Sequence, residues 1–142
     1  MDNQKLKVLI AEDEFLLAMD IKRKLEELGF DVTSLTTTAL ETITKAESDK
    51  PNIILMDVQL TGSLNGIEAA KIITYRNQVP IIFLIEDSIQ KDFAQFNLNI
   101  NFELLIKPVT SNNISNALKN IMLKTDMFAK NITLPSSFIF KL

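Results

Sequence analysis

Cysteine and histidine are both absent from the 142 residues of this sequence. Without cysteine the chain can form no disulfide, no thiolate zinc site and no thiol nucleophile. Without histidine it lacks the Ser-His-Asp and Cys-His catalytic arrangements, the common histidine metal sites and any role as a phosphohistidine donor. Chemistry at a site in this chain therefore depends on carboxylates, lysines and hydroxyl groups.

Positive charge and long apolar runs are also scarce. The net charge is −3, and the one basic cluster, Lys22-Arg23-Lys24, is soon followed by Glu26 and Glu27. Nucleic-acid binding needs a stripe of positive charge, so we expect none by this chain directly. No apolar run is longer than seven residues, far short of a membrane span, and the first apolar run ends in acids, unlike a signal peptide. We expect a soluble, cytoplasmic protein with no membrane partner.

Five short apolar runs indicate the strands of one sheet. Four of them are nearly continuous rather than alternating, which is typical of parallel strands buried on both faces, and the second is weaker. The predicted strands are Val8–Ala11, Val32–Leu35, Ile53–Met56, Pro80–Ile85 and Phe102–Ile106.

Helical patterns lie between and after these strands. The first carries Leu17, Ile21, Leu25 and Leu28 on one face and stops at Gly29. The second begins with a Thr38–Glu41 capping box and carries Leu40, Ile43 and Ala46 facing inward, and the third begins at Gly66 and carries Ile67, Ala70 and Ile73. A short fourth is marked by Ile89, Phe93 and Phe96, and the fifth follows a cap at Thr110 or Ser111 with Ile114, Ala117, Leu118 and Ile121. Regular alternation of strand and helix predicts a doubly wound α/β fold with helices on both faces of the sheet.

Charged side chains follow three of the predicted strands. Glu12 and Asp13 follow the first strand, Asp57 the third and Lys107 the fifth. Ligands of open parallel sheets bind beyond the carboxyl ends of the strands, where the strand order reverses. If the order is 2-1-3-4-5, the three carboxylates converge within a few ångströms, with Lys107 on the far side of Asp57.

Three crowded carboxylates repel one another unless a cation lies between them. Oxygen ligands that leave positions open for water and phosphate favour Mg²⁺. A lysine facing an aspartate at such a cation suits phosphoryl transfer, with Asp57 as the nucleophile that forms an acyl phosphate. Taken alone, each of these residues is also typical of a solvated loop, a turn cap or a chain stop, and so does not indicate a site. Only their joint placement indicates a site.

Several segments together resemble the successive motifs of response-regulator receiver domains. They are KVLIAEDE, IILMDVQL, NGIEAAKII, PIIFLI and LLIKP, which lie in the family's order within residues 5–124. The resemblance implies a flavodoxin-like receiver domain over residues 1–124, with a five-stranded parallel sheet of order 2-1-3-4-5. It also implies a non-enzymatic signalling switch that takes a phosphoryl group from the phosphohistidine of a sensor histidine kinase.

The same resemblance implies a role for each site residue. Asp57 is the phosphoacceptor, Asp13 and Asp57 bind Mg²⁺ directly with the backbone carbonyl of Gln59, and Glu12 acts through water. Lys107 contacts the phosphoryl oxygens, and Lys107-Pro108 is similar to the family's cis peptide bond.

Two positions depart from the receiver pattern. Receivers usually carry Thr or Ser at the end of the fourth strand, before a small residue, where this chain has Ile85 and Glu86. They also carry an aromatic residue three positions before the lysine, where this chain has Leu104. We call Ile85 and Leu104 the switch positions.

Three hypotheses for function remain open from the sequence. The first is a phospho-accepting receiver domain. The second is a pseudo-receiver, an interaction module without phosphorylation-dependent switching. The switch positions favour it, and the complete set of Glu12, Asp13, Asp57 and Lys107 opposes it. The third is a metal-dependent phosphatase with an aspartyl nucleophile, which is disfavoured because Gln59 stands where a second aspartate would be needed.

Residues 125–142 extend beyond the receiver pattern as a tail or linker. Its ITLPSSFIFKL segment resembles the opening strand of LytTR-type DNA-binding domains, which would make the tail the start of a truncated output domain. Alternatively, its apolar residues pack on this domain or on a partner, because an exposed apolar segment would otherwise be a free pairing edge. We therefore consider a homodimer and a downstream output domain as partners.

Overall fold

Five parallel strands form the central sheet of the structure, a computed structural model that describes residues 4–125, 127 and 132–133. The strands are β2 (Lys7–Ala11), β3 (Asp31–Thr36), β4 (Ile53–Asp57), β5 (Ile81–Ile85) and β6 (Phe102–Ile106). They lie in the order β3-β2-β4-β5-β6, which is the predicted order 2-1-3-4-5 because a short strand β1 precedes them. Each predicted strand is present, with ends that differ by at most one residue.

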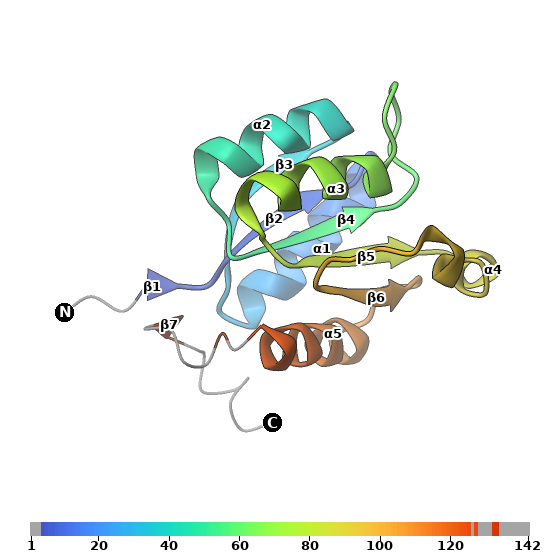
Figure 1. The fold of residues 1–142 in the computed structure, drawn as a ribbon. Coiled ribbons are helices and arrows are strands. Elements are labelled where there is room, and N and C mark those ends of the chain that lie inside the picture. The colour runs from blue at the N-terminus through green and yellow to red at the C-terminus, as the bar shows by residue number, and fades with distance from the viewer. Residues whose placement is uncertain (1–3, 126, 128–131, 134–142) are drawn as a thin grey trace.

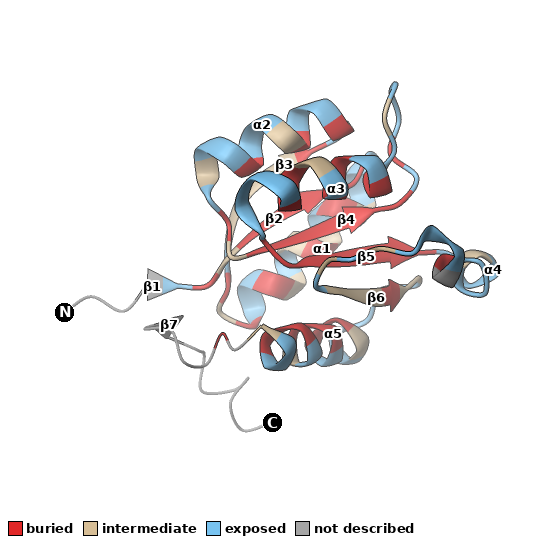
Figure 2. Cartoon of the chain, in the orientation of Figure 1, coloured by how far each residue is buried: buried red, intermediate tan, exposed pale blue. Residues whose placement is uncertain are grey.

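Helices cover both faces of this sheet (Figure 1). These are α1 (Phe15–Glu27) and α5 (Ser111–Lys124) on one face and α2 (Ala39–Asp49) and α3 (Gly66–Asn77) on the other. The short helix α4 (Asp87–Gln90) and the 3₁₀ helix η1 (Phe93–Phe96) follow β5. Alternate strand residues point to opposite faces: Ile10 and Leu55 pack with α1 and α5, whereas Leu9 and Phe83 pack with α2 and α3. The central strands are buried on both faces (Figure 2). The doubly wound α/β fold is confirmed.

Side chains cap α5, α3 and α2 at their N-termini. The Thr110 hydroxyl accepts from the Asn113 backbone N–H, and the Asn113 side chain returns a bond to Thr110, a complete capping box. Asn65 and Glu68 form a second complete box at the start of α3. At α2 the Thr38 hydroxyl accepts from the Glu41 N–H, which is one half of the predicted box.

Two sequence expectations about the helices were wrong. Leu40 is 59% exposed, because α2 turns Ala39, Thr42 and Ala46 toward the sheet and Leu40 lies one residue around the helix. The predicted fourth helix is two short pieces, α4 and η1. Phe93 folds η1 back onto Phe83 and Phe102, with ring centroids 5.3 and 5.4 Å away, so packing takes precedence over a continuous helix.

The two ends of the described chain meet beside the sheet. β1 (Gln4–Lys5) pairs in parallel with β7 (Ile132–Thr133), and the buried Met127 belongs to the core cluster under α1 and α5. Most of the segment that resembles the LytTR strand lies outside the described residues. Within the described part of the chain, no helix has the length and apolar character to cross a membrane.

Candidate functional site

Three carboxylates meet at the carboxyl ends of β2 and β4. These strands are neighbours with Ala11 opposite Met56, so the residues that follow them share one edge of the sheet. Glu12, Asp13 and Asp57 each place a carboxylate oxygen within 4.8 Å of the others. Glu12 and Asp57 are buried, whereas Asp13 is exposed and faces the open side of the site.

The Asp57 carboxylate is held by one donor on each oxygen. The Lys107 ammonium donates to Oδ2 at 2.6 Å, and the Gln59 backbone N–H donates to Oδ1 at 2.8 Å. Lys107 follows β6, and its own backbone N–H donates to the carbonyl of Ile85 at the end of β5. The Lys107-Pro108 peptide bond is cis, as the family resemblance implies.

Lys107 also contacts two further carboxylates. Its Nζ lies 3.6 Å from Oε1 of Glu12 and 3.8 Å from Oε1 of Glu86. The lysine is therefore not confined to the far side of Asp57, as the strand order alone suggested, but lies among three acids. The Glu86 contact was missed in the sequence, although Glu86 follows a strand at the same sheet edge.

Burial and crowding alter the acid–base properties of this cluster. Burial, together with the neighbouring Asp57 carboxyl, raises the pKa of Glu12 to about 8. Burial by itself lowers the pKa of Lys107, but its hydrogen bond to Asp57 and the charges of Asp57, Glu12 and Glu86 together outweigh that effect and raise it. The lysine therefore stays charged, while the buried glutamate resists ionisation until a cation stabilises it.

The donor set fits a hard divalent cation. All three acids offer oxygen ligands close together, and Oε1 of Glu12 is buried with no hydrogen bond, 3.6 Å from Nζ of Lys107, so it can bind a cation or accept a hydrogen bond from its water. Asp13 is exposed, so the cluster is accessible to solvent. Asp57 and Lys107 then lie where a phosphoryl group beside the cation would find both a nucleophile and an ammonium.

Gly66 allows α3 to start directly against the site. A Cβ atom at this position would lie 2.2 Å from the backbone oxygen of Asp57, inside any allowed contact distance. The Gly66 N–H donates to the carbonyl of Val58 at 3.0 Å, which fixes the loop after Asp57 against the helix start. The site backbone therefore depends on a residue without a side chain.

The switch positions carry only hydrocarbon. Ile85 is 1% exposed and packs in the core under α2 and α3, and Leu104 lies opposite Phe83 as a partly buried member of the same cluster. Neither side chain can donate a hydrogen bond to a phosphoryl oxygen.

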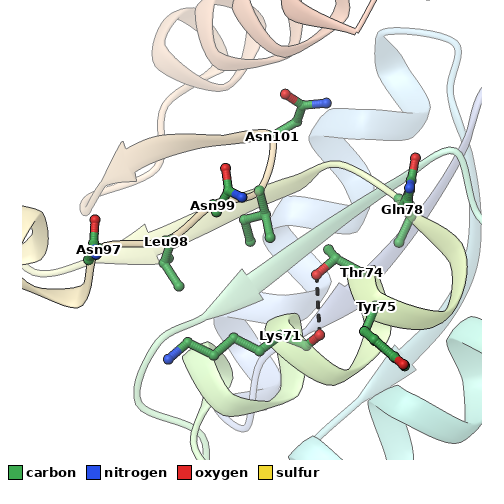
Figure 3. Close-up of a pocket in the computed structure, with 10 residues that line it drawn as sticks. Lys71, Thr74, Tyr75, Gln78, Asn97, Leu98, Asn99 and Asn101 are labelled. Carbon is green, nitrogen blue, oxygen red and sulfur yellow. Dashed lines mark hydrogen bonds between the residues drawn. The ribbon is translucent and has the colours of Figure 1, made fainter.

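A separate hollow of about 580 Å³ lies between the C-terminal part of α3 and residues 97–101. Leu98 points toward α3 there, while Asn97, Asn99 and Asn101 point away from it (Figure 3). Its lining segment runs from Asn97, directly after η1, to Asn101, directly before β6, and does not include Asp57. It is not part of the acidic site.

Comparison with known proteins identifies the family. The model of the response regulator receiver domain matches residues 8–119, well over half of the chain. The chain belongs to the response regulator receiver family. Its module is a signalling domain of two-component systems, and its flavodoxin-like fold agrees with that of solved receiver domains.

Two curated relatives are full-length regulators that the chain matches in part. It is 38% identical over 78 residues to the phyllosphere-induced regulator PhyR of Methylorubrum extorquens, a match that covers 54% of this chain and 29% of PhyR. It is 36% identical over 89 residues to the transcriptional regulatory protein PdtaR of Mycobacterium tuberculosis, which covers 63% of this chain and 42% of PdtaR. The matches thus span less than half of either relative.

Two solved receiver domains match almost along their whole length. The receiver domain of a modulated diguanylate cyclase from Desulfovibrio desulfuricans has a TM-score of 0.74 and 28% identity, covering 87% of this chain and 98% of that one. The receiver domain of the sensor histidine kinase PA1611 from Pseudomonas aeruginosa has a TM-score of 0.72 and 27% identity, covering 83% and 98%. That second structure holds a magnesium ion in its active-site cleft.

Proposed function

We propose that this receiver domain accepts a phosphoryl group on Asp57 from the phosphohistidine of a sensor histidine kinase, with Mg²⁺ bound beside it. The observation that carries this proposal is the environment of Asp57. Its buried carboxylate is 2.6 Å from the Lys107 ammonium and shares an open oxygen-ligand cluster with Glu12 and Asp13. The magnesium ion in the related PA1611 receiver supports the same cofactor here.

Each site residue has a separate task in this proposal. A carboxylate oxygen of Asp57 bonds to phosphorus while the bond from phosphorus to the donor histidine nitrogen breaks, and the nitrogen keeps the electron pair. Lys107 holds the equatorial oxygens, and the Gln59 N–H steadies the other Asp57 oxygen. Asp13, Asp57 and the Gln59 carbonyl hold the cation, with Glu12 acting through water. Mg²⁺ supplies positive charge against the charge that builds up on the phosphoryl oxygens.

The proposed activity is that of a switch in the cytoplasm rather than of an enzyme with its own substrate. The histidine donor must come from another protein or domain, because this sequence contains no histidine. We propose a homodimer or a downstream output domain as the receiver of the signal, since PhyR and PdtaR are both longer regulators that this chain matches only in part.

Mg²⁺ should raise the melting temperature of the wild type and have little effect on Asp13→Asn. The ion relieves repulsion among the three acids and binds the folded state only, so the shift should increase with concentration and at low salt. Thermal unfolding in chelator and in millimolar MgCl₂ measures this. Asp31→Asn, an exposed change at the opposite edge of the sheet, is the control. An undiminished response in Asp13→Asn would place the ion elsewhere.

The size of this Mg²⁺ response should depend on pH. The pKa of Glu12 is about 8 in the folded chain and 4.5 as an ordinary value, so the folded chain binds an extra proton between these values. This contribution to stability is fully present below 4.5 and is lost as pH rises through about 8. Unfolding in chelator should therefore become easier across this window, and Mg²⁺, which favours the ionised acid, should reduce the decline.

The pseudo-receiver is the second candidate, and the switch positions favour it. A lost hydrogen bond to a charged group costs about 1.5–3 kcal/mol, which matches a typical allosteric coupling energy of about 1–3 kcal/mol. Beryllofluoride with Mg²⁺ should therefore shift NMR signals near Asp57 and only weakly those of Ser88–Phe96 and Leu104. Ile85→Thr should enlarge the distant shifts, whereas Ile85→Val should not. Large distant shifts in the wild type would contradict this role of Ile85.

We propose that residues 1–124 form the receiver domain and that the described residues after it, Met127 and Ile132–Thr133, pack with it as part of one folded unit. The β1–β7 pairing and the buried Met127 support packing over a severed domain start. Deleting residues 131–142 should lower the melting temperature or change the oligomeric state, measured by thermal unfolding and light scattering. A truncated protein with unchanged melting temperature and unchanged oligomeric state would instead favour the interpretation of the tail as the start of an output domain.

A further inference from the structure

Glu86 places a fourth acidic side chain at the mouth of the site. Its Oε1 lies 3.8 Å from Nζ of Lys107, and its side chain is 54% exposed. Glu86 is also the N-cap residue of α4, yet its side chain makes no capping hydrogen bond. The carboxylate is therefore directed to the lysine rather than to the helix.

The position of Glu86 separates it from the other acids. Glu12 and Asp57 are buried, and with Asp13 they form the oxygen cluster that fits a cation. Glu86 lies outside that cluster and contacts its lysine from the solvent side. A divalent cation held by the three acids would offset most of their charge but not that of Glu86.

The role of Lys107 makes this charge consequential. The ammonium is shared by Asp57 at 2.6 Å, Glu12 at 3.6 Å and Glu86 at 3.8 Å. An incoming phosphoryl group must take Lys107 from Glu86 and come close to the Glu86 carboxylate. The more negative the donor, the greater the repulsion, since the interaction scales with the product of the charges.

We propose that Glu86 determines donor specificity by selecting against phosphodonors according to their negative charge. Small, doubly anionic donors are disfavoured, and a donor protein that brings a cationic side chain beside its phosphoryl group, where it can pair with Glu86, is favoured. This inference rests on the proposed phosphorylation of Asp57 and names the chemistry of the donor that the site selects.

Two small donors of different charge isolate the effect. Near neutral pH acetyl phosphate carries two negative charges, and phosphoramidate, with a protonated nitrogen, carries a net single one. With acetyl phosphate, an Asp57 oxygen bonds to phosphorus and acetate leaves with the electron pair. With phosphoramidate, the P–N bond breaks and neutral ammonia leaves with the pair, its three protons already in place.

The experiment compares the rates at which the wild type, Glu86→Gln and Asp87→Asn gain one phosphoryl group from each donor in Mg²⁺, followed by intact mass. Asp87 is the matched control because it is an exposed acid next to Glu86. Glu86→Gln should raise the acetyl phosphate rate by roughly tenfold and the phosphoramidate rate by only about threefold, and high salt should shrink both gains. Asp87→Asn should stay near the wild type.

A second measurement does not depend on turnover. Glu86→Gln should bind beryllofluoride with Mg²⁺ several-fold more tightly than the wild type, measured by NMR titration, with unchanged thermal stability. Equal gains with both donors, or no gain, would overturn the role of Glu86 alone. No adduct with either donor in any variant would overturn the phosphorylation of Asp57 itself, and the inference with it.

Discussion

Incubation with acetyl phosphate and Mg²⁺ should add one phosphoryl group to the wild type and none to Asp57→Asn. The buried Asp57 carboxylate forms a 2.6 Å hydrogen bond with the Lys107 ammonium. This bond fixes the position of the nucleophile and places the ammonium where it can contact the phosphoryl oxygens. The asparagine keeps the size of the side chain but has no carboxylate to form an acyl phosphate. Intact-mass measurement over time follows the adduct.

The dependence on Mg²⁺ tests the rest of the site. Chelator should abolish the adduct, because an anionic donor otherwise meets uncompensated carboxylates. Lys107→Met should slow its formation, whereas Asp31→Asn should leave the rate unchanged. An adduct that persists in Asp57→Asn would show that another residue is the phosphoacceptor. An adduct that forms equally well in chelator would show that the reaction does not need Mg²⁺.

Gly66→Ala should destabilise the protein more than Gly62→Ala, although both add a single methyl group. The new Cβ would lie 2.2 Å from the Asp57 carbonyl oxygen and 3.0 Å from Cα of Val58, and both are backbone atoms that no side-chain rotation can move. Relief requires α3 to shift away from β4, which also disturbs the loop after Asp57. We expect a loss of about 3 kcal/mol in the free energy of unfolding, at the upper end of typical overpacking costs.

Gly62→Ala is the matched control for that change. Gly62 has φ +113°, but the nearest heavy atom to its added Cβ is 4.0 Å away, so this substitution tests backbone strain without a clash. Its cost should be about 1–2 kcal/mol. Urea unfolding of both variants provides the comparison. A Gly66→Ala protein as stable as the wild type would show that the helix start is not held against Asp57.

Local patterns in the sequence were sufficient for most of the fold. Continuous apolar runs such as Ile53–Met56 predict buried parallel strands, and the Thr110 cap and the Gly29 stop mark helix ends that the structure contains. These features depend on neighbours a few residues away, so they are present in the sequence itself. The prediction of a single fourth helix was wrong because Phe93 packs on Phe83 and Phe102, and neither contact is local in the sequence.

For the candidate site, the sequence by itself determined which residue types stand at which strand ends, and hence that Glu12, Asp13, Asp57 and Lys107 belong to one edge of the sheet. Only the tertiary structure decided which of these side chains form ion pairs with one another. It places Lys107 among Asp57, Glu12 and Glu86, and it brings α3 so close to β4 that position 66 must be glycine. The reason is physical: apolar runs and helix caps are local signals and the strand order came from the family resemblance, whereas contacts of a few ångströms depend on the register and packing of segments that lie far apart in the chain.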